Sequence, residues 1–120
     1  MIVDDHKDVR FLIRAIIDDA DEDVVVVGEA DGVRAALESI DQLDPDVVVL
    51  DAVMPAVTGF EAAPMILARR PDQKILLCSA LVDEEVCAKA DDAGISECVS
   101  KDDMDAIPWI AVSLARDSGP

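Results

Sequence analysis

Apolar positions along this chain follow two alternating patterns, short continuous runs and helical spacings. The runs predict five buried strands, at residues 1–3, 24–27, 47–50, 74–78 and 98–100. Between them, apolar residues three and four positions apart predict five helices, at residues 8–17, 33–43, 60–68, 83–93 and 103–115. Strands that alternate with helices favour a parallel sheet with right-handed crossovers and helices on both faces. The pattern therefore predicts an α/β/α protein of three layers.

The 120 residues amount to about one domain, and no linker, repeat or low-complexity segment interrupts them. We expect the domain to span residues 1–116 and residues 117–120 to be a loose tail or the start of a linker. The first apolar run, Met1 to Val3, is short for a strand. Its length leaves open whether the strand is simply brief or lacks residues in front of it.

Side chains that carry chemistry follow four of the predicted strands. Asp4 and Asp5 follow the first strand, Asp51 the third, Ser79 the fourth and Lys101 the fifth. Because the carboxyl ends of parallel strands meet at one edge of a sheet, these residues should converge there. Each of them alone would more often be a solvated loop or turn residue. Their coincidence at four strand ends predicts a functional site.

Such a cluster suits phosphoryl chemistry. Three neighbouring carboxylates need a cation, and oxygen ligands alone favour Mg²⁺ over zinc. Asp51 could then attack phosphorus as a nucleophile and form an acyl phosphate. Mg²⁺ would neutralise two phosphoryl oxygens, while Lys101 pairs with the third and the Ser79 hydroxyl hydrogen-bonds the product. The added charge, about −1.5 to −2, would bias a local rearrangement.

Composition excludes several classes of function. The net charge is −17, with 27 Asp and Glu against ten Lys and Arg, so this chain alone should not bind nucleic acid. No apolar run approaches the length of a membrane span and no leader is recognisable, so we expect a soluble, cytoplasmic protein without a membrane contact. The cysteines Cys78, Cys87 and Cys98 lack metal-binding spacing and are interpreted as reduced structural thiols.

The motifs form a set whose order and spacing are specific. They are Asp4-Asp5, Asp-x-x-Met-Pro at 51–55, Gly59, Ser79-Ala80, Ala93-Gly94 and Lys101. In this order they resemble the receiver domain of two-component response regulators over essentially the whole chain. The Asp-Asp-His opening and the Lys101-Asp102 step resemble, more narrowly, the NarL-like subfamily attached to LuxR-type helix-turn-helix domains.

This resemblance implies a flavodoxin-like, doubly wound sheet with strand order 2-1-3-4-5 and five helices. It implies that Asp51 accepts a phosphoryl group from the phosphohistidine of a sensor histidine kinase, and that Ser79 and Lys101 contact that group. The Mg²⁺ ligands that it implies are Asp5, Asp51, the backbone carbonyl of Val53 and, through a water, Asp4. The chain would be a phosphoacceptor and not a turnover enzyme. It would be a fragment of a transcriptional regulator with an absent DNA-binding domain, or a stand-alone receiver.

Two positions depart from the family pattern. Cys98 stands where the family usually carries a Tyr or Phe that rotates on activation, so Ser79 and Cys98 are the expected switch residues. Thr58 replaces an acidic residue common before the loop glycine. On the last helix, Trp109 lies off the apolar stripe. Two interpretations remain open: the indole packs against a neighbouring side chain, or it contacts a homodimer partner or an output domain.

Three alternatives to a receiver domain that is phosphorylated remain. A haloacid-dehalogenase-type phosphatase would need Asp-x-Asp, and Val53 occupies the second acidic position. A flavodoxin would need a hydroxyl-rich phosphate loop after the first strand, where this chain has Asp4-Asp5-His6. The third is a receiver-like interaction module that signals without phosphorylation, and only Cys98 favours it.

Overall fold

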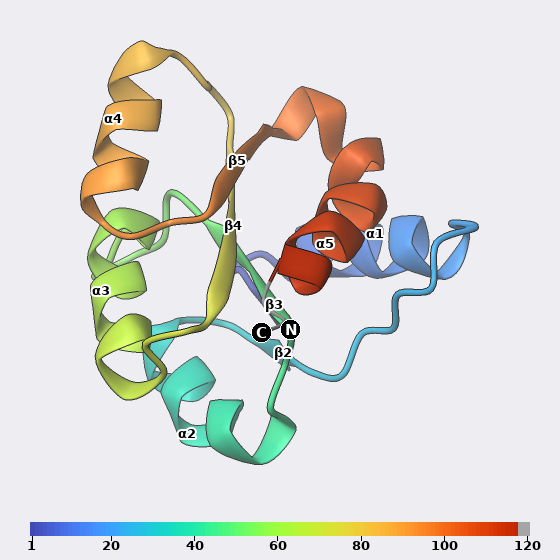
Figure 1. Ribbon diagram of the computed structural model, residues 1–120, viewed down its shortest axis with the longest axis horizontal. Helices are drawn as coiled ribbons and strands as arrows, with labels where there is room; N and C mark the ends of the chain where they lie inside the picture. Colours follow the sequence, from blue (N-terminus) through green and yellow to red (C-terminus); the bar gives the residue numbers. More distant parts are fainter. Residues whose placement is uncertain (118–120) are drawn as a thin grey trace.

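The computed structural model describes residues 1–117, over which the chain folds around a five-stranded sheet (Figure 1). The strands are β1 (Ile2–Val3), β2 (Glu29–Ala30), β3 (Val47–Asp51), β4 (Lys74–Ser79) and β5 (Glu97–Ser100). All neighbouring pairs are parallel, in the order β2-β1-β3-β4-β5. The predicted flavodoxin-like fold is confirmed.

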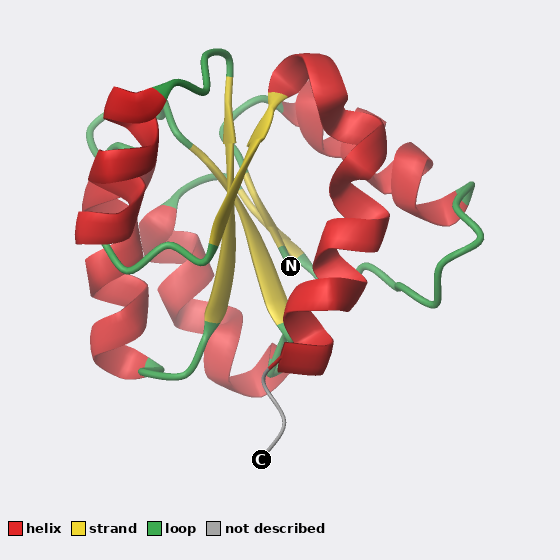
Figure 2. Ribbon diagram, turned by 45° about the horizontal axis from the view of Figure 1, so that its top comes forward, coloured by secondary structure: helices red, strands yellow, loops and turns green. Residues whose placement is uncertain are grey.

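Helices cover both faces of this sheet (Figure 2). They are α1 (Lys7–Asp18), α2 (Val33–Leu43), α3 (Gly59–Arg69), α4 (Glu84–Asp92) and α5 (Ile107–Asp117), with a 3₁₀ helix, η1 (Lys101–Ala106), directly before α5. α1 and α5 pack on one face, and α2, α3 and α4 on the other. None of the helices between residues 1 and 117 is long and apolar enough to cross a membrane.

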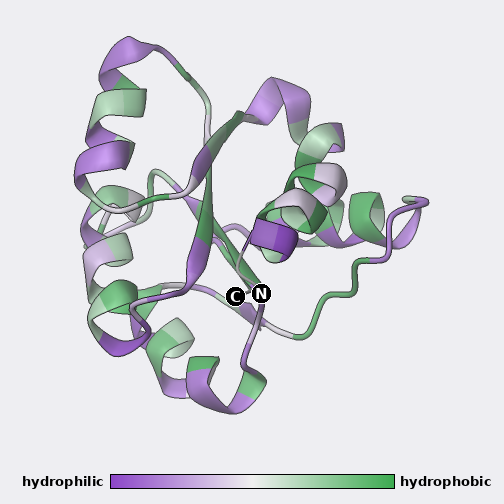
Figure 3. Cartoon of the chain, viewed as in Figure 1, coloured by the Kyte–Doolittle hydropathy of each residue, from purple (hydrophilic) through white to green (hydrophobic). Residues whose placement is uncertain are grey.

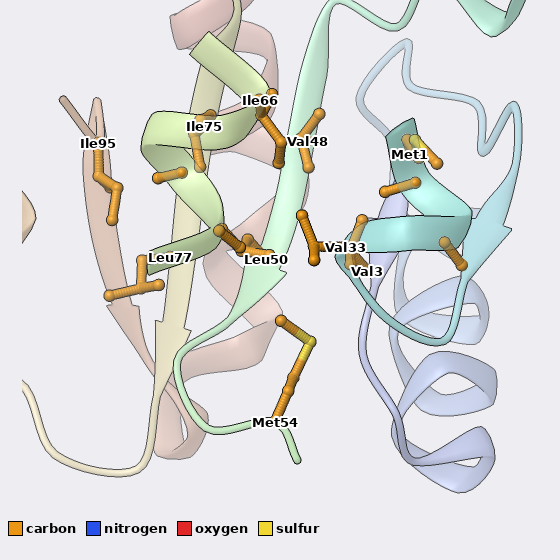
Figure 4. Close-up of a cluster of buried hydrophobic side chains, with 14 of the residues drawn as sticks. Met1, Val3, Val33, Val48, Leu50, Met54, Ile66, Ile75, Leu77 and Ile95 are labelled. Carbon is orange, nitrogen blue, oxygen red and sulfur yellow. The ribbon is translucent and has the colours of Figure 1, made fainter. Parts of the chain in front are cut away.

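The central strands are apolar on both faces, as the continuous valine run of β3 predicts. Every residue of β3 is buried, including Asp51 at its end. Hydrophobic positions extend along the strands, while the helices alternate between hydrophobic and hydrophilic positions (Figure 3). Val48, Leu50, Ile75 and Leu77 meet side chains from α2 and α3 in one of the two cores (Figure 4). The sheet is therefore held from both sides, which fixes where its strands end.

The expected strand at residues 24–27 is wrong. The strand lies at Glu29–Ala30 and begins two residues after the end of the expected one, and the valine run is an extended loop at the side of the molecule (Figure 3). Val25 is 76% exposed. The reason lies in the register, because Ile2 pairs with Glu29 and Val3 with Ala30. No residue of β1 is left to pair with the run.

The last predicted helix divides into two. Asp103 has non-helical dihedral angles (φ −121°, ψ 31°), so the segment before α5 forms η1. Pro108 has no N–H and cannot donate to the carbonyl of Met104, which prevents one continuous α-helix. α5 runs to Asp117, one residue past the expected domain boundary. The other residues of the expected tail, 118–120, lie outside the described part of the chain.

Candidate functional site

Two strands deliver carboxylates to one edge of the sheet. Val3 pairs with Leu50 across β1 and β3, so Asp4 follows β1 at the level of Asp51, the last residue of β3. Asp4 and Asp51 are each only 2% exposed. Two carboxylates so deep in a protein need compensating partners. The sheet register therefore brings the first and third strand ends together at one edge, where the strand pattern predicts that strand ends meet.

The acidic cluster is compact. One ligand atom from each of Asp4, Asp5, His6 and Asp51 lies within 4.8 Å of the others. His6 was not among the predicted site residues, although it follows the two aspartates directly. Its Nδ1 is 3.4 Å from Asp4 Oδ1 and 3.2 Å from Asp5 Oδ1, and its side chain is 63% exposed. The imidazole thus covers the outer side of the aspartate pair.

Lys101 supplies the positive charge of the site. Its Nζ lies 2.9 Å from Asp51 Oδ1, although the two residues are fifty positions apart. Burial alone would lower the pKa of the Lys101 ammonium, but the hydrogen bond and charge of Asp51, together with the charge of Asp4, outweigh burial and raise it. Lys101 is therefore a firmly protonated partner of the buried carboxylate.

Asp4 is held in place by one backbone donor and one side-chain donor. The N–H of His6 donates to Asp4 Oδ1 at 2.8 Å, and Arg10 Nη1 donates to the Asp4 carbonyl at 2.6 Å. Arg10 also reaches Glu29 on β2 at 3.1 Å, which ties α1 to the edge strand. Burial raises the pKa of the Asp4 carboxyl, the His6 N–H opposes this, and the negative charge of Asp51 adds to it. A cation in the cluster would reverse that trend.

Two buried oxygens of the cluster fit a metal ion. Asp5 Oδ1 and Asp51 Oδ2 are buried and, among residues 1–117, no group hydrogen-bonds to either. His6 is near Asp5 Oδ1, but without the geometry of a hydrogen bond. Unpartnered carboxylate oxygens suit a hard divalent cation, and Mg²⁺ prefers oxygen ligands. The donor set therefore fits the expected Mg²⁺.

The loop after Asp51 is positioned by a glycine and a threonine. A Cβ on Gly59 would lie 2.4 Å from the Asp51 carbonyl oxygen, so only glycine allows α3 to begin this close to β3. Thr58 forms a capping box with Glu61, in which the Glu61 N–H donates to the Thr58 hydroxyl at 3.2 Å. Thr58, where the family often has an acidic residue, thus fixes the start of α3.

Val53 lies in this loop, two residues after Asp51. Its N–H points at Asp51 Oδ1 across 3.4 Å, and the side chain is 71% exposed. The family resemblance implies that its backbone carbonyl binds the metal. That assignment stays a prediction.

The two expected switch residues sit on neighbouring strands. Ser79 ends β4 and is buried, and its Oγ donates to the Leu81 carbonyl at 2.8 Å. Cys98 pairs with Leu77 in the sheet and packs, half-buried, against the core under α2, α3 and α4. Burial raises the pKa of its thiol to about 11. Their coupling as a switch stays a prediction.

The fold and this acidic edge define a class of flavodoxin-like α/β domains with an acidic cluster at the carboxyl ends of the strands. The sequence profile of the response regulator receiver domain matches residues 1–108. The chain belongs to the response regulator receiver domain family.

Individual relatives agree with this assignment. The chain is 35% identical to the chemotaxis protein CheY of Listeria monocytogenes over 101 residues, 84% of this chain and 83% of that protein. It is 38% identical over 103 residues to the DNA-binding transcriptional activator DevR/DosR of Mycobacterium tuberculosis, of which it spans 46%. The receiver domain of a putative regulator NarL from Mycobacterium tuberculosis superposes with a TM-score of 0.85 at 30% identity, over 96% of this chain and 93% of that one. Both single-domain and DNA-binding relatives thus share the fold.

Proposed function

We propose that this chain is a phosphorylation-dependent signalling switch in which Asp51 is the phosphoacceptor. The observation that carries the proposal is the Lys101–Asp51 pair at 2.9 Å beside a compact acidic cluster. A nucleophilic carboxylate must be fixed at the strand end and balanced by cations. The residues at this edge of the sheet support both requirements.

The acceptor step is a phosphoryl transfer from a sensor histidine kinase. A carboxylate oxygen of Asp51 attacks phosphorus, the phosphorus–nitrogen bond of the donor phosphohistidine breaks, and the imidazole leaves with the electron pair. Lys101 stays protonated and turns from the carboxylate to a phosphoryl oxygen. Asp5, Asp51 and the Val53 carbonyl would hold Mg²⁺ directly, and Asp4 through a water. When bound, this ion offsets the negative charge that builds up during transfer.

The switch itself would involve Ser79. Its hydroxyl now donates to the Leu81 carbonyl, and rotation toward a phosphoryl group on Asp51 would release the loop after β4. Cys98 would replace the larger aromatic that usually follows this movement. Because Cys98 fills less space, the rearrangement would be carried mainly by the loop and α4.

The downstream function that the switch controls is proposed from the relatives. Similarity to a DNA-binding activator and to a NarL receiver supports a NarL-like transcriptional regulator, whose DNA-binding part would be separate because this chain is so acidic. Trp109 on α5 is 57% exposed and supports a contact with a second copy or an output domain. As a phosphoacceptor of the cytoplasm, the chain itself would not turn over a substrate.

Intact mass spectrometry tests the acceptor function. The chain is incubated with acetyl phosphate and Mg²⁺, next to Asp51→Asn and a control, Asp46→Asn. Asp46 is exposed and precedes the other end of the same strand. We expect one added phosphoryl group in the parent and in the control, and none in Asp51→Asn or with EDTA. If the parent gains no phosphoryl group, the chain acts as an interaction module independent of phosphorylation.

A further inference from the structure

His6 lies against the acidic cluster, although the acceptor chemistry proposed above does not use its side chain. Its Nδ1 is 3.4 Å from Asp4 Oδ1 and 3.2 Å from Asp5 Oδ1. One ligand atom from each of Asp4, Asp5, His6 and Asp51 lies within 4.8 Å of the others. The cluster therefore offers a nitrogen donor beside its carboxylate oxygens.

The spacing of these atoms resembles that of ligands around one metal ion. Ligands at about 2.1 Å from an ion lie about 3.0 Å apart on the edge of an octahedron and about 3.4 Å apart on the edge of a tetrahedron. The distances from His6 Nδ1 to the two aspartate oxygens, 3.2 and 3.4 Å, fall in this range. A ring nitrogen and carboxylate oxygens at such distances are spaced to share an ion.

The contact between His6 and Asp5 is not a hydrogen bond. Asp5 Oδ1 has no hydrogen-bond partner among residues 1–117, although Nδ1 is 3.2 Å away. Asp51 Oδ2 is also without a partner in that part of the chain, in a side chain that is 1% exposed, while Lys101 contacts the other oxygen of this carboxylate. Buried polar atoms normally have partners. A cation supplies a partner for both oxygens and for the lone pair of a neutral imidazole.

The backbone of His6 is fixed, but its side chain is available. His6 is the N-cap residue of α1, and its side chain makes no cap hydrogen bond. Its N–H donates to Asp4 Oδ1 at 2.8 Å, and its carbonyl accepts from the N–H groups of Val9 and Arg10, each at 3.1 Å. The side chain is 63% exposed. An ion that enters from solvent can therefore reach the imidazole without disturbing the start of α1.

A nitrogen donor changes which ions the cluster prefers. Mg²⁺ favours oxygen ligands, whereas imidazole suits transition ions such as Co²⁺, Ni²⁺ and Zn²⁺. We propose that His6 Nδ1 is a metal ligand that makes the acidic cluster a site for a divalent transition-metal ion, held together with Asp5 and Asp51. Mg²⁺ binds the carboxylates and leaves the imidazole free. This inference rests on the proposed function only in placing a divalent cation in the cluster.

Isothermal titration calorimetry with CoCl₂ and with MgCl₂, without a phosphodonor, measures the selectivity. The parent is compared with His6→Ala and with His6→Asn, which places a favoured N-cap residue before α1. We expect each variant to lose Co²⁺ affinity about tenfold or more, while Mg²⁺ affinity changes less than about twofold. The control is Asp8→Asn, because Asp8 is exposed in the first turn of α1 and lies outside the cluster. It should affect both ions equally.

Pulsed electron paramagnetic resonance of the Mn²⁺ complex identifies the ligand atom. The chain contains a single histidine, so an imidazole nitrogen coupled to bound Mn²⁺ belongs to His6. We expect this coupling in the parent and in Asp8→Asn, and none in either His6 variant.

Two outcomes would overturn the proposal. One is a ratio of Co²⁺ to Mg²⁺ affinity that both His6 variants leave unchanged, with no nitrogen coupling in the parent. That result would leave the Mg²⁺ site of the proposed function intact. The other is a parent that binds neither ion, which would remove the cation from the proposed function as well.

Discussion

Replacing Asp5 by asparagine should stabilise the protein in the absence of a divalent cation. Asp5 Oδ1 is buried without a hydrogen-bond partner among the described residues, and the carboxylates of Asp4 and Asp51 are its neighbours. An asparagine removes one of three negative charges and adds an N–H₂ group that can donate to the two that remain. The same change removes a ligand that Mg²⁺ needs. Stability and metal binding should therefore move in opposite directions.

The size of the effect follows from the cluster geometry. At a separation of 4.8 Å, two carboxylates repel each other by about 3.5 kcal/mol at an effective dielectric constant of about 20. Asp5 has two such neighbours, which gives an upper bound of about 7 kcal/mol. Its side chain is 21% exposed, and solvent screening reduces such energies several-fold. We expect a gain in unfolding free energy of about 1–2 kcal/mol, or about 3–10 °C in Tm.

Thermal unfolding with EDTA and with saturating MgCl₂ measures both effects. The parent should gain about 2.7 kcal/mol when Mg²⁺ is at a hundred times its dissociation constant, and Asp5→Asn should gain far less. Asp31→Asn is the matched control, because Asp31 is exposed and lies outside the cluster. An Asp5→Asn variant that is less stable than the parent in EDTA would contradict this prediction. Charge repulsion would then not be the main effect of Asp5 on stability when no metal is bound.

A glycine, the cysteines and the amino terminus give three further predictions. Gly59→Ala should lower the unfolding free energy by about 1–3 kcal/mol, because the added Cβ would lie 2.4 Å from the Asp51 carbonyl oxygen. Urea titrations measure this, and an unchanged urea midpoint of unfolding would contradict it. With iodoacetamide at pH 8, exposed Cys87 should be alkylated first. Burial raises the thiol pKa values of Cys78 and Cys98 to about 11, so only about 0.1% of each is thiolate at this pH. Three equally fast alkylations in mass spectrometry would contradict this prediction. For the chain that begins at Met1, the free energy of unfolding should rise by about 1.9 kcal/mol from pH 6 to pH 8. The reason is that the unfolded ammonium, with its ordinary pKa of 8.0, binds the proton that the folded one, with a pKa of about 6, releases. Denaturant titrations without this slope, or with the same slope after acetylation of the amino terminus, would count against it.

The strand pattern was sufficient for a parallel sheet and for the meeting of Asp4, Asp5, Asp51 and Lys101, whereas the strand order was predicted from the family resemblance. Continuous apolar runs specify buried parallel strands, and parallel strands place their carboxyl ends at one edge. The same logic placed Trp109 off the apolar stripe of the last helix, and it is indeed exposed. Long-range convergence was predictable here because topology alone produces it.

Local features that depend on a partner were not predictable. The valine run at 24–27 has the composition of a strand, but a strand forms only where another backbone supplies hydrogen bonds, and β1 pairs with residues 29 and 30. The 3₁₀ start of the last helix reflects the kink at Asp103 and the missing N–H of Pro108. His6 was not predicted as a site residue, because an exposed histidine indicates no function until its distances to the aspartates are known.

The most direct test of the central claim is to locate the phosphoryl group. The chain is treated with acetyl phosphate and Mg²⁺, the acyl phosphate is reduced with borohydride, and the peptides are sequenced by mass spectrometry. We expect a reduced side chain at residue 51 and nowhere else. Reduction at Asp4 or Asp5, or an unmodified residue 51 in a chain that has gained a phosphoryl group, would contradict it.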